Sequence, residues 1–137
     1  MDTNVLAPGF VGIASVSVRL ISLWQAGGYE LVVSDHLLSE LERTFGDPYF
    51  AARVPVAKAT SALQLLRADA RFTDLTVTVS GIATQPEDDL VLATALSGGA
   101  SYLATRDKQL LKIGHYRGLL ILHPGDVLDL LSQASNI

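Results

Sequence analysis

Hydrophobic positions along the chain recur with two periods, one typical of strands and one typical of amphipathic helices. Short apolar runs predict strands over residues 29–33, 75–79, 102–104 and 119–122, and residues 1–6 fit the end of a strand that leads into a loop at 7–9. Helical spacing predicts helices over residues 15–25, 35–44, 49–54, 55–70, 87–97, 108–112 and 126–131. The alternation of these elements predicts an α/β fold with a parallel sheet.

Residues at the predicted helix ends support several of these boundaries. Ser34 is a suitable N-cap for the helix that begins at Asp35. Pro55 and Pro86 suit the first turn of a helix, where a backbone N–H is not needed. We expect the glycine pairs at residues 27–28 and 98–99 to end the helices before them.

Length and composition narrow the class of protein. The 137 residues fit one compact domain, so we expect a single domain over residues 1–137. The absence of cysteine excludes disulfides, zinc–thiolate sites and thiol catalysis. No apolar run approaches the roughly 20 residues that span a bilayer, and the start of the chain lacks the pattern of a signal peptide. We therefore expect no membrane association and a cytoplasmic location.

The formal net charge of −4 argues mildly against a protein that holds nucleic acid by bulk electrostatic attraction. It does not exclude a nuclease, because an acidic site becomes locally less negative when it binds divalent cations. Composition therefore does not indicate the substrate, and the function has to be inferred from the positions of particular residues.

Four acidic residues fall where an open parallel sheet carries its chemistry, beyond the carboxyl ends of its strands. Asp2 ends the first predicted strand, and Asp107 follows the strand at residues 102–104. Asp88 lies in the first turn of the helix that precedes that strand, and Glu40 lies one turn into the helix after residues 29–33. Each acid alone fits a cap, a turn or a surface position, but together they predict one carboxylate site.

Clustered carboxylates repel one another and raise each other's pKa, and a divalent cation removes that penalty. Oxygen-only ligands suit Mg²⁺ and Mn²⁺ rather than zinc. Such ions lower the pKa of a bound water and orient it for in-line attack on a phosphodiester. Arg106 and Lys108 flank Asp107 and are candidates for contact with a substrate phosphate, although solvated loop charges fit them equally well.

Four segments resemble, in order and spacing, the motifs of PIN domains. They are residues 2–6, which begin Asp2-Thr3-Asn4, and residues 34–41, 86–96 and 101–111. The resemblance covers essentially the whole chain. It implies a three-layer α/β/α sandwich around a central, mainly parallel sheet. Members of the family usually have several apolar residues before the first aspartate, and here only Met1 precedes Asp2, so we expect a truncated first strand.

The resemblance also implies Mg²⁺- or Mn²⁺-dependent endoribonuclease activity, most like that of VapC-type toxins of toxin–antitoxin pairs. Its catalytic and metal-binding residues would be Asp2, Glu40, Asp88 and Asp107. Asn4, Thr105 and Asp89 would orient carboxylates or phosphate. Asp88 is preferred over Asp89 as the catalytic and metal-binding residue because of its interval to residues 95–96. The implied partners are an RNA substrate, an antitoxin that occupies a groove of the first two helices, and a second copy in a homodimer.

Two other functions are weighed against the nuclease. A phosphoacceptor receiver domain needs an acidic pair after its first strand and a lysine after its fifth. Here the acidic pair comes late, and His123-Pro124 follows the last strand, so we disfavour it. A catalytically inactive PIN-like module that binds RNA or protein remains open because of the short first strand.

Overall fold

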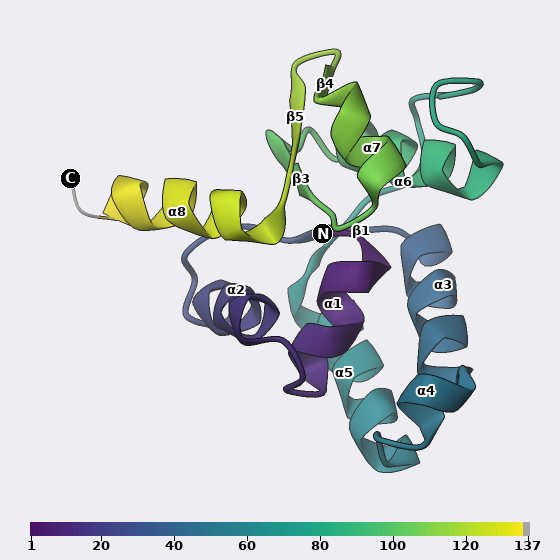
Figure 1. Ribbon diagram of the computed structural model, residues 1–137, viewed down its shortest axis with the longest axis vertical. Coiled ribbons are helices and arrows are strands. Elements are labelled where there is room, and N and C mark those ends of the chain that lie inside the picture. The colour runs from purple at the N-terminus through teal and green to yellow at the C-terminus, as the bar shows by residue number, and fades with distance from the viewer. Residues whose placement is uncertain (136–137) are drawn as a thin grey trace.

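The computed structural model describes residues 1–135, which form eight helices and five short strands (Figure 1). The strands are β1 (Val32–Val33), β2 (Arg71–Phe72), β3 (Tyr102–Ala104), β4 (His115–Tyr116) and β5 (Leu119–Leu122). The helices are α1 (Thr3–Phe10), α2 (Ser15–Gln25), α3 (Asp35–Gly46), α4 (Pro48–Ala51), α5 (Val56–Asp69), α6 (Pro86–Ser97), α7 (Lys108–Ile113) and α8 (Pro124–Ser135).

The strands form two separate small sheets. β1 pairs with β2 in parallel, while β5 lies between a parallel β3 and an antiparallel β4. The parallel pairings agree with the predicted α/β class. The single central sheet of a three-layer sandwich is not present among residues 1–135, because no strand joins β1 to β3.

Most of the predicted elements are confirmed. The bounds of α2, β3 and β5 are those that the sequence pattern indicates, and α6 and α7 differ by one residue at one end. Ser34 caps α3 as expected, and its hydroxyl accepts a hydrogen bond from the Leu37 N–H at 3.3 Å. α8 begins two residues before Asp126, at Pro124, and the last two residues of the chain lie outside the described part.

The predicted strand at residues 1–6 is wrong, because a helix begins at Thr3. The Asp2 carboxylate caps this helix and accepts a hydrogen bond from the Thr3 N–H at 2.7 Å. The Asp2 carbonyl accepts from the N–H groups of Val5 and Leu6 at 3.0 and 3.1 Å. An aspartate in this position is a strong helix start, and it outweighs the strand preference of the valine that follows.

The predicted strand at residues 75–79 is also wrong. The Ser97 hydroxyl accepts hydrogen bonds from the N–H groups of Thr76 and Val77, each at 3.0 Å, and these contacts replace a strand ladder. The parallel partner of β1 instead forms earlier, at Arg71–Phe72, directly after α5. Residues 73–85 are irregular because side chains from α6 satisfy their backbone.

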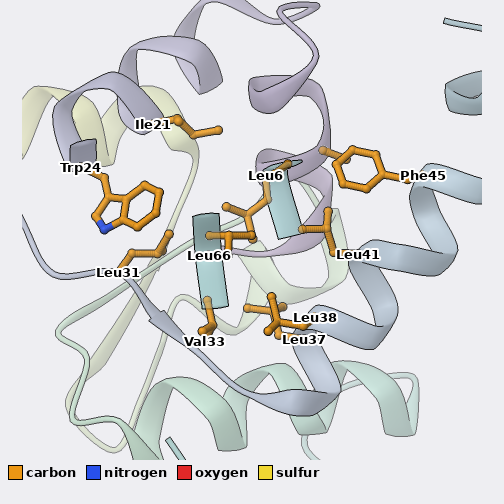
Figure 2. Close-up of a cluster of buried hydrophobic side chains, with 12 residues drawn as sticks. Leu6, Ile21, Trp24, Leu31, Val33, Leu37, Leu38, Leu41, Phe45 and Leu66 are labelled. Carbon is orange, nitrogen blue, oxygen red and sulfur yellow. The ribbon is translucent and has the colours of Figure 1, made fainter. Parts of the chain in front are cut away.

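Each sheet has its own hydrophobic core, and α1 contributes to two clusters. Leu6 packs with residues of β1, α3 and α5 in the cluster that Figure 2 shows, in which Leu37, Leu38 and Leu41 of α3 face Leu66 of α5. Val5 packs with residues of α2, β3 and α8. A further cluster lies between α6, α7 and the sheet of β3 and β5. The first helix therefore connects the two halves of the molecule.

No single helix among the described residues is long and apolar enough to cross a membrane. The pair α1 and α2 reaches the required length and composition only when taken together, and the two helices meet at 87°.

Candidate active site

Asp2 is buried beside the end of β3. Its backbone N–H donates to the Ala104 carbonyl at 2.9 Å, and only 4% of the residue is exposed. Its Oδ2 accepts hydrogen bonds from the Thr105 hydroxyl at 2.8 Å and from the Asn4 amide at 3.3 Å, while Oδ1 caps α1. These contacts hold the first predicted site residue in one orientation.

Thr105 connects Asp2 to Asp107. Its fully buried hydroxyl donates to Asp2 and accepts from the Asp107 N–H at 3.0 Å and from the Asn4 amide at 3.3 Å. The Asp107 Oδ1 caps α7 by accepting from the N–H groups of Gln109 and Leu110. The Thr105 hydroxyl thus fixes the Asp2 carboxylate and also the turn that carries the Asp107 carboxylate.

Asn4 and Arg106 form a second connection between the same segments. The Asn4 Oδ1 accepts from the Arg106 N–H at 3.0 Å, which fixes the side chain with its amide nitrogen toward Asp2. The Arg106 guanidinium donates to the Asn4 carbonyl at 3.1 Å and to the Ser17 hydroxyl at 2.8 Å, and burial lowers its pKa. Arg106 therefore braces α1 and α2 here, and its predicted phosphate contact stays a prediction. Lys108 is exposed next to the site.

Glu40 reaches the site from α3. Its Oε1 accepts a hydrogen bond from the Thr3 hydroxyl at 3.3 Å. Its Oε2 lies 3.5 Å from the His36 Nε2, one helical turn earlier. Within residues 1–135, both of these atoms are buried and make no hydrogen bond. Glu40 consequently presents a carboxylate oxygen that the described protein does not satisfy.

The electrostatics show that the four predicted acids converge. The pKa of Glu40 is raised to about 7, first by burial and then by the carboxylate of Asp2, with smaller contributions from Glu87 and Asp88 and a lowering contribution from the Thr3 hydrogen bond. The pKa of Asp88 is raised to about 6, first by burial and then by neighbouring carboxylates, of which Asp107 and Asp2 contribute most. Asp2 and Asp88 therefore act on Glu40, and Asp107 and Asp2 act on Asp88.

Asp89 binds the backbone of the segment before α6. It is buried, and its two carboxylate oxygens accept hydrogen bonds from the backbone N–H groups of Gly81, Ile82 and Ala83 at 3.0, 3.2 and 2.7 Å. These contacts hold the irregular segment before α6. The expected role of Asp89 in orienting the site carboxylates is replaced by this loop contact.

Three residues join the site that the sequence motifs do not single out. Thr3 and Glu87 are next to Asp2 and Asp88, so their positions within the motifs were the available signal. His36 precedes Glu40 by four residues, a spacing that puts two side chains on one helix face. The relation of Thr3 and Glu87 to Glu40, in contrast, emerges only when α1, α3 and α6 are brought together.

The side chains of the four acids suit a hard divalent cation, because all of them offer carboxylate oxygens as ligands. In the described part of the chain, the buried Oε2 of Glu40 makes no hydrogen bond and could serve as such a ligand. The acids are not drawn into a closed ligand shell. Among residues 1–135, no group of three or more His, Asp or Glu side chains stands in an arrangement that could hold a metal ion.

Comparison with known families agrees with this arrangement. The family model described as the PIN domain matches residues 1–109, which include all four acids and the residues that hold them. The chain belongs to the PIN domain family. PIN domains are generally nucleases that use divalent metals. No curated protein and no solved structure matches the chain, so the family assignment rests on this match.

Thr105→Val is expected to destabilise this PIN domain by about 1–3 kcal/mol, because it removes a buried hydroxyl and leaves its partners unsatisfied. Chemical denaturation measures the change in the free energy of unfolding. Thr105→Ser keeps the hydroxyl and serves as the control. Equal stability of the valine and serine variants would show that the hydrogen bonds to Asp2 and Asp107 contribute little.

The metal-free protein is expected to lose stability as the pH rises from about 4.5 through about 7. Glu40 has a raised pKa, so in this range the folded state binds more protons than the unfolded state, and ionisation favours unfolding. Glu40→Gln should flatten this dependence and stabilise the protein at pH 8 by about 1–2 kcal/mol, after allowance for partial solvent screening.

Thermal unfolding in chelator-treated buffer from pH 4.5 to 8 measures this effect. Glu42→Gln is the matched control, because Glu42 lies on the same helix and is exposed. A pH profile that is the same in Glu40→Gln and Glu42→Gln would contradict the repulsion that the site geometry implies.

Proposed function

We propose that this PIN domain is a Mg²⁺- or Mn²⁺-dependent endoribonuclease that hydrolyses phosphodiester bonds with a metal-activated water. The observation that carries the proposal is that Asp2 and Asp88 raise the pKa of Glu40, while Asp2 and Asp107 raise that of Asp88, although the four acids come from separate segments. Raised carboxylate pKa values at one end of an α/β fold are typical of a functional site rather than of a structural one.

The proposed roles follow from the contacts of each side chain. Asp2 is the rigid ligand, because Thr105 and Asn4 fix its carboxylate. Glu40 supplies the unsatisfied Oε2, and Asp88 supplies a carboxylate whose ionised form is disfavoured without a cation. Asp107 has one oxygen committed to capping α7. A bound divalent ion supplies neutralising charge and a water of lowered pKa.

One positively charged side chain, that of Lys108, lies close to the acids. Lys108 is exposed one residue after Asp107, where an RNA phosphate that approaches the acids would meet it. The wider surface is not basic, as the net charge of −4 indicates. We therefore infer that RNA is held mainly at the site itself and that binding depends only moderately on salt.

A role as a VapC-type toxin is the finer proposal, together with a cytoplasmic location, an antitoxin partner and a homodimer. Its support is a set of large apolar side chains at the surface. Ile13, between α1 and α2, is 45% exposed, and Tyr49 and Val56 are 50% and 82% exposed. The proposal takes these residues as parts of one patch, because contiguous apolar patches mark surfaces that bind a partner.

One observation favours a second candidate, a PIN-like module that binds RNA without cutting it. The acids of the described chain do not form a group that could hold a metal ion. The two functions make opposite predictions for cleavage but similar predictions for RNA binding. Measurement of both on the same preparation separates them.

Asp88→Asn is expected to reduce cleavage of a structured RNA in Mn²⁺ by about 100-fold or more, because it removes a carboxylate that would hold the cation, and the cation would stabilise the charge of the transition state. Asp107→Asn should do the same, and asparagine can still cap α7, so folding is retained. Cleavage is followed on a denaturing gel with end-labelled RNA.

Glu42→Gln is the control for this assay, since it also removes one acid but from an exposed position outside the site. Loss of cleavage in the two aspartate variants with full activity in Glu42→Gln supports the proposal. RNA binding with no cleavage by the unaltered chain supports the binding module. Cleavage that persists in both aspartate variants would identify a contaminating nuclease.

Mn²⁺ at millimolar concentration is expected to raise the melting temperature by about 3–8 °C, because a ligand that binds only the folded state stabilises it. The rise should be larger at pH 8 than at pH 5.5, where protons compete for Glu40 and Asp88. Differential scanning fluorimetry measures it, with NaCl at matched ionic strength as the control. A response to Mn²⁺ that is unchanged in Glu40→Gln would remove Glu40 from the ligand set.

A further inference from the structure

His36 and Glu40 carry two buried side-chain atoms that make no hydrogen bond among residues 1–135. They are the His36 Nε2 and the Glu40 Oε2, which lie 3.5 Å apart. Both side chains are mostly shielded from solvent, with 16% and 20% exposed. A buried polar atom without a partner is unfavourable, so two of them side by side point to a ligand that satisfies both.

The other two histidines have different surroundings. His115 is exposed on β4, and the Nδ1 of His123 accepts a hydrogen bond from the Gly125 N–H at 3.1 Å. In the described residues, neither of them has a buried nitrogen without a partner. His36 is thus the histidine whose unpartnered nitrogen lies beside a candidate metal ligand.

Two hydrogen bonds fix α3 against the segments that supply other acids. The Thr3 hydroxyl donates to the Oε1 of Glu40 at 3.3 Å. The hydroxyls of Ser34 and Thr94 share a hydrogen bond of 2.8 Å, which ties the start of α3 to α6. α3 packs against both α1 and α6 (Figure 1). Because residues four apart lie on one helix face, His36 is on the same side of α3 as Glu40.

A direct bond between the two side chains is the alternative use of these atoms. Their separation of 3.5 Å exceeds the distance of about 2.7–3.2 Å at which N–H···O hydrogen bonds form. A divalent ion with ligand bonds of about 2.1 Å can join two ligand atoms that lie up to about 4 Å apart. The observed separation therefore suits two ligands of one ion better than a hydrogen bond.

An imidazole nitrogen changes which ion the site would prefer. Mg²⁺ takes oxygen ligands and keeps several waters, so it gains little from a nitrogen. First-row transition ions bind imidazole more readily, and Mn²⁺ is the one among them that also suits carboxylate oxygens. Four acids together with one histidine consequently suit Mn²⁺ better than four acids alone.

We propose that His36 is a nitrogen ligand of the divalent cation and that it makes the site select Mn²⁺ over Mg²⁺. The inference rests on the proposed function, because it takes the acids to hold a cation. The His36 Nε2 and the Glu40 Oε2 supply two ligand atoms from one face of α3. Asp2 supplies the carboxylate that Thr105 fixes. Binding would satisfy both buried atoms that the described chain leaves without a hydrogen bond.

The experiment records the electron spin echo modulation of Mn²⁺ on the full chain at saturating metal, since this modulation reports nitrogen atoms bonded to the ion. The unaltered chain is compared with His36→Phe, His36→Gln and, as the matched control, His115→Gln at an exposed position. We expect nitrogen modulation in the unaltered chain and in His115→Gln, and its loss in both His36 variants. Histidine labelled with the heavy nitrogen isotope should alter the modulation of the unaltered chain.

Thermal unfolding of the same proteins measures the selectivity. At equal millimolar concentration, Mn²⁺ should raise the melting temperature of the unaltered chain by at least about 3 °C more than Mg²⁺ does. The difference should shrink to within about 1 °C in both His36 variants. If His36 only oriented Glu40 by a hydrogen bond, glutamine would replace it and the preference for Mn²⁺ would persist in His36→Gln, which would contradict the ligand role.

The remaining outcomes separate this inference from the proposed function. Bound Mn²⁺ whose nitrogen modulation is unchanged in His36→Phe would overturn the role of His36 and leave the nuclease proposal standing. An equal response of the unaltered chain to Mn²⁺ and Mg²⁺ would overturn the selectivity. An unchanged spectrum of free Mn²⁺ in the presence of the unaltered chain would show that no ion binds, and both proposals would then be wrong.

Discussion

The hydrogen bonds of Asp2 to the end of β3 connect the start of the chain to a segment more than one hundred residues later. The Asp2 N–H meets the Ala104 carbonyl, and its carboxylate accepts from the buried hydroxyl of Thr105. Buried hydrogen bonds to a charged group are among the stronger polar contacts in proteins. Because α1 begins at the next residue, this attachment also places Val5 and Leu6 in two separate core clusters.

The negative charges of the site lower the stability of the folded protein, and the local surroundings of each acid differ in how far they offset this cost. Asp88 lies in the first turn of α6, where the helix dipole favours negative charge, and Asp107 caps α7. Glu40 has neither advantage, since it lies in the middle of α3 beside other carboxylates and a His36 nitrogen that donates no hydrogen bond among the described residues. Burial is nevertheless the largest cause of the raised pKa in both residues, which reaches about 7 for Glu40 and about 6 for Asp88. Residues with unfavourable local energies of this kind are typical of functional positions.

The sequence could predict those features that depend on local pattern. α2, β3 and β5 follow from periodicity and from clear stops. The shared-edge rule does not account for the position of Asp2, which caps a helix instead of ending a strand. The helix at Thr3 was missed because one side-chain cap decided it. The irregular segment at residues 73–85 was missed because its backbone is satisfied by Ser97 and Asp89, which come later in the chain. Contacts between distant residues of this kind leave no local signal, and the same holds for Thr3 with Glu40.

The separation of the sheets and the open arrangement of the acids have a common geometric origin. Glu40 is carried by the helix that follows β1, whereas Asp107 follows β3 directly. The distance between these strands therefore sets the distance between the two carboxylates. Among residues 1–135, Asp2 is hydrogen-bonded to the end of β3 and makes no hydrogen bond to β1. The geometry with which these acids would meet a cation therefore depends on how the two sheets are spaced as well as on the side chains themselves.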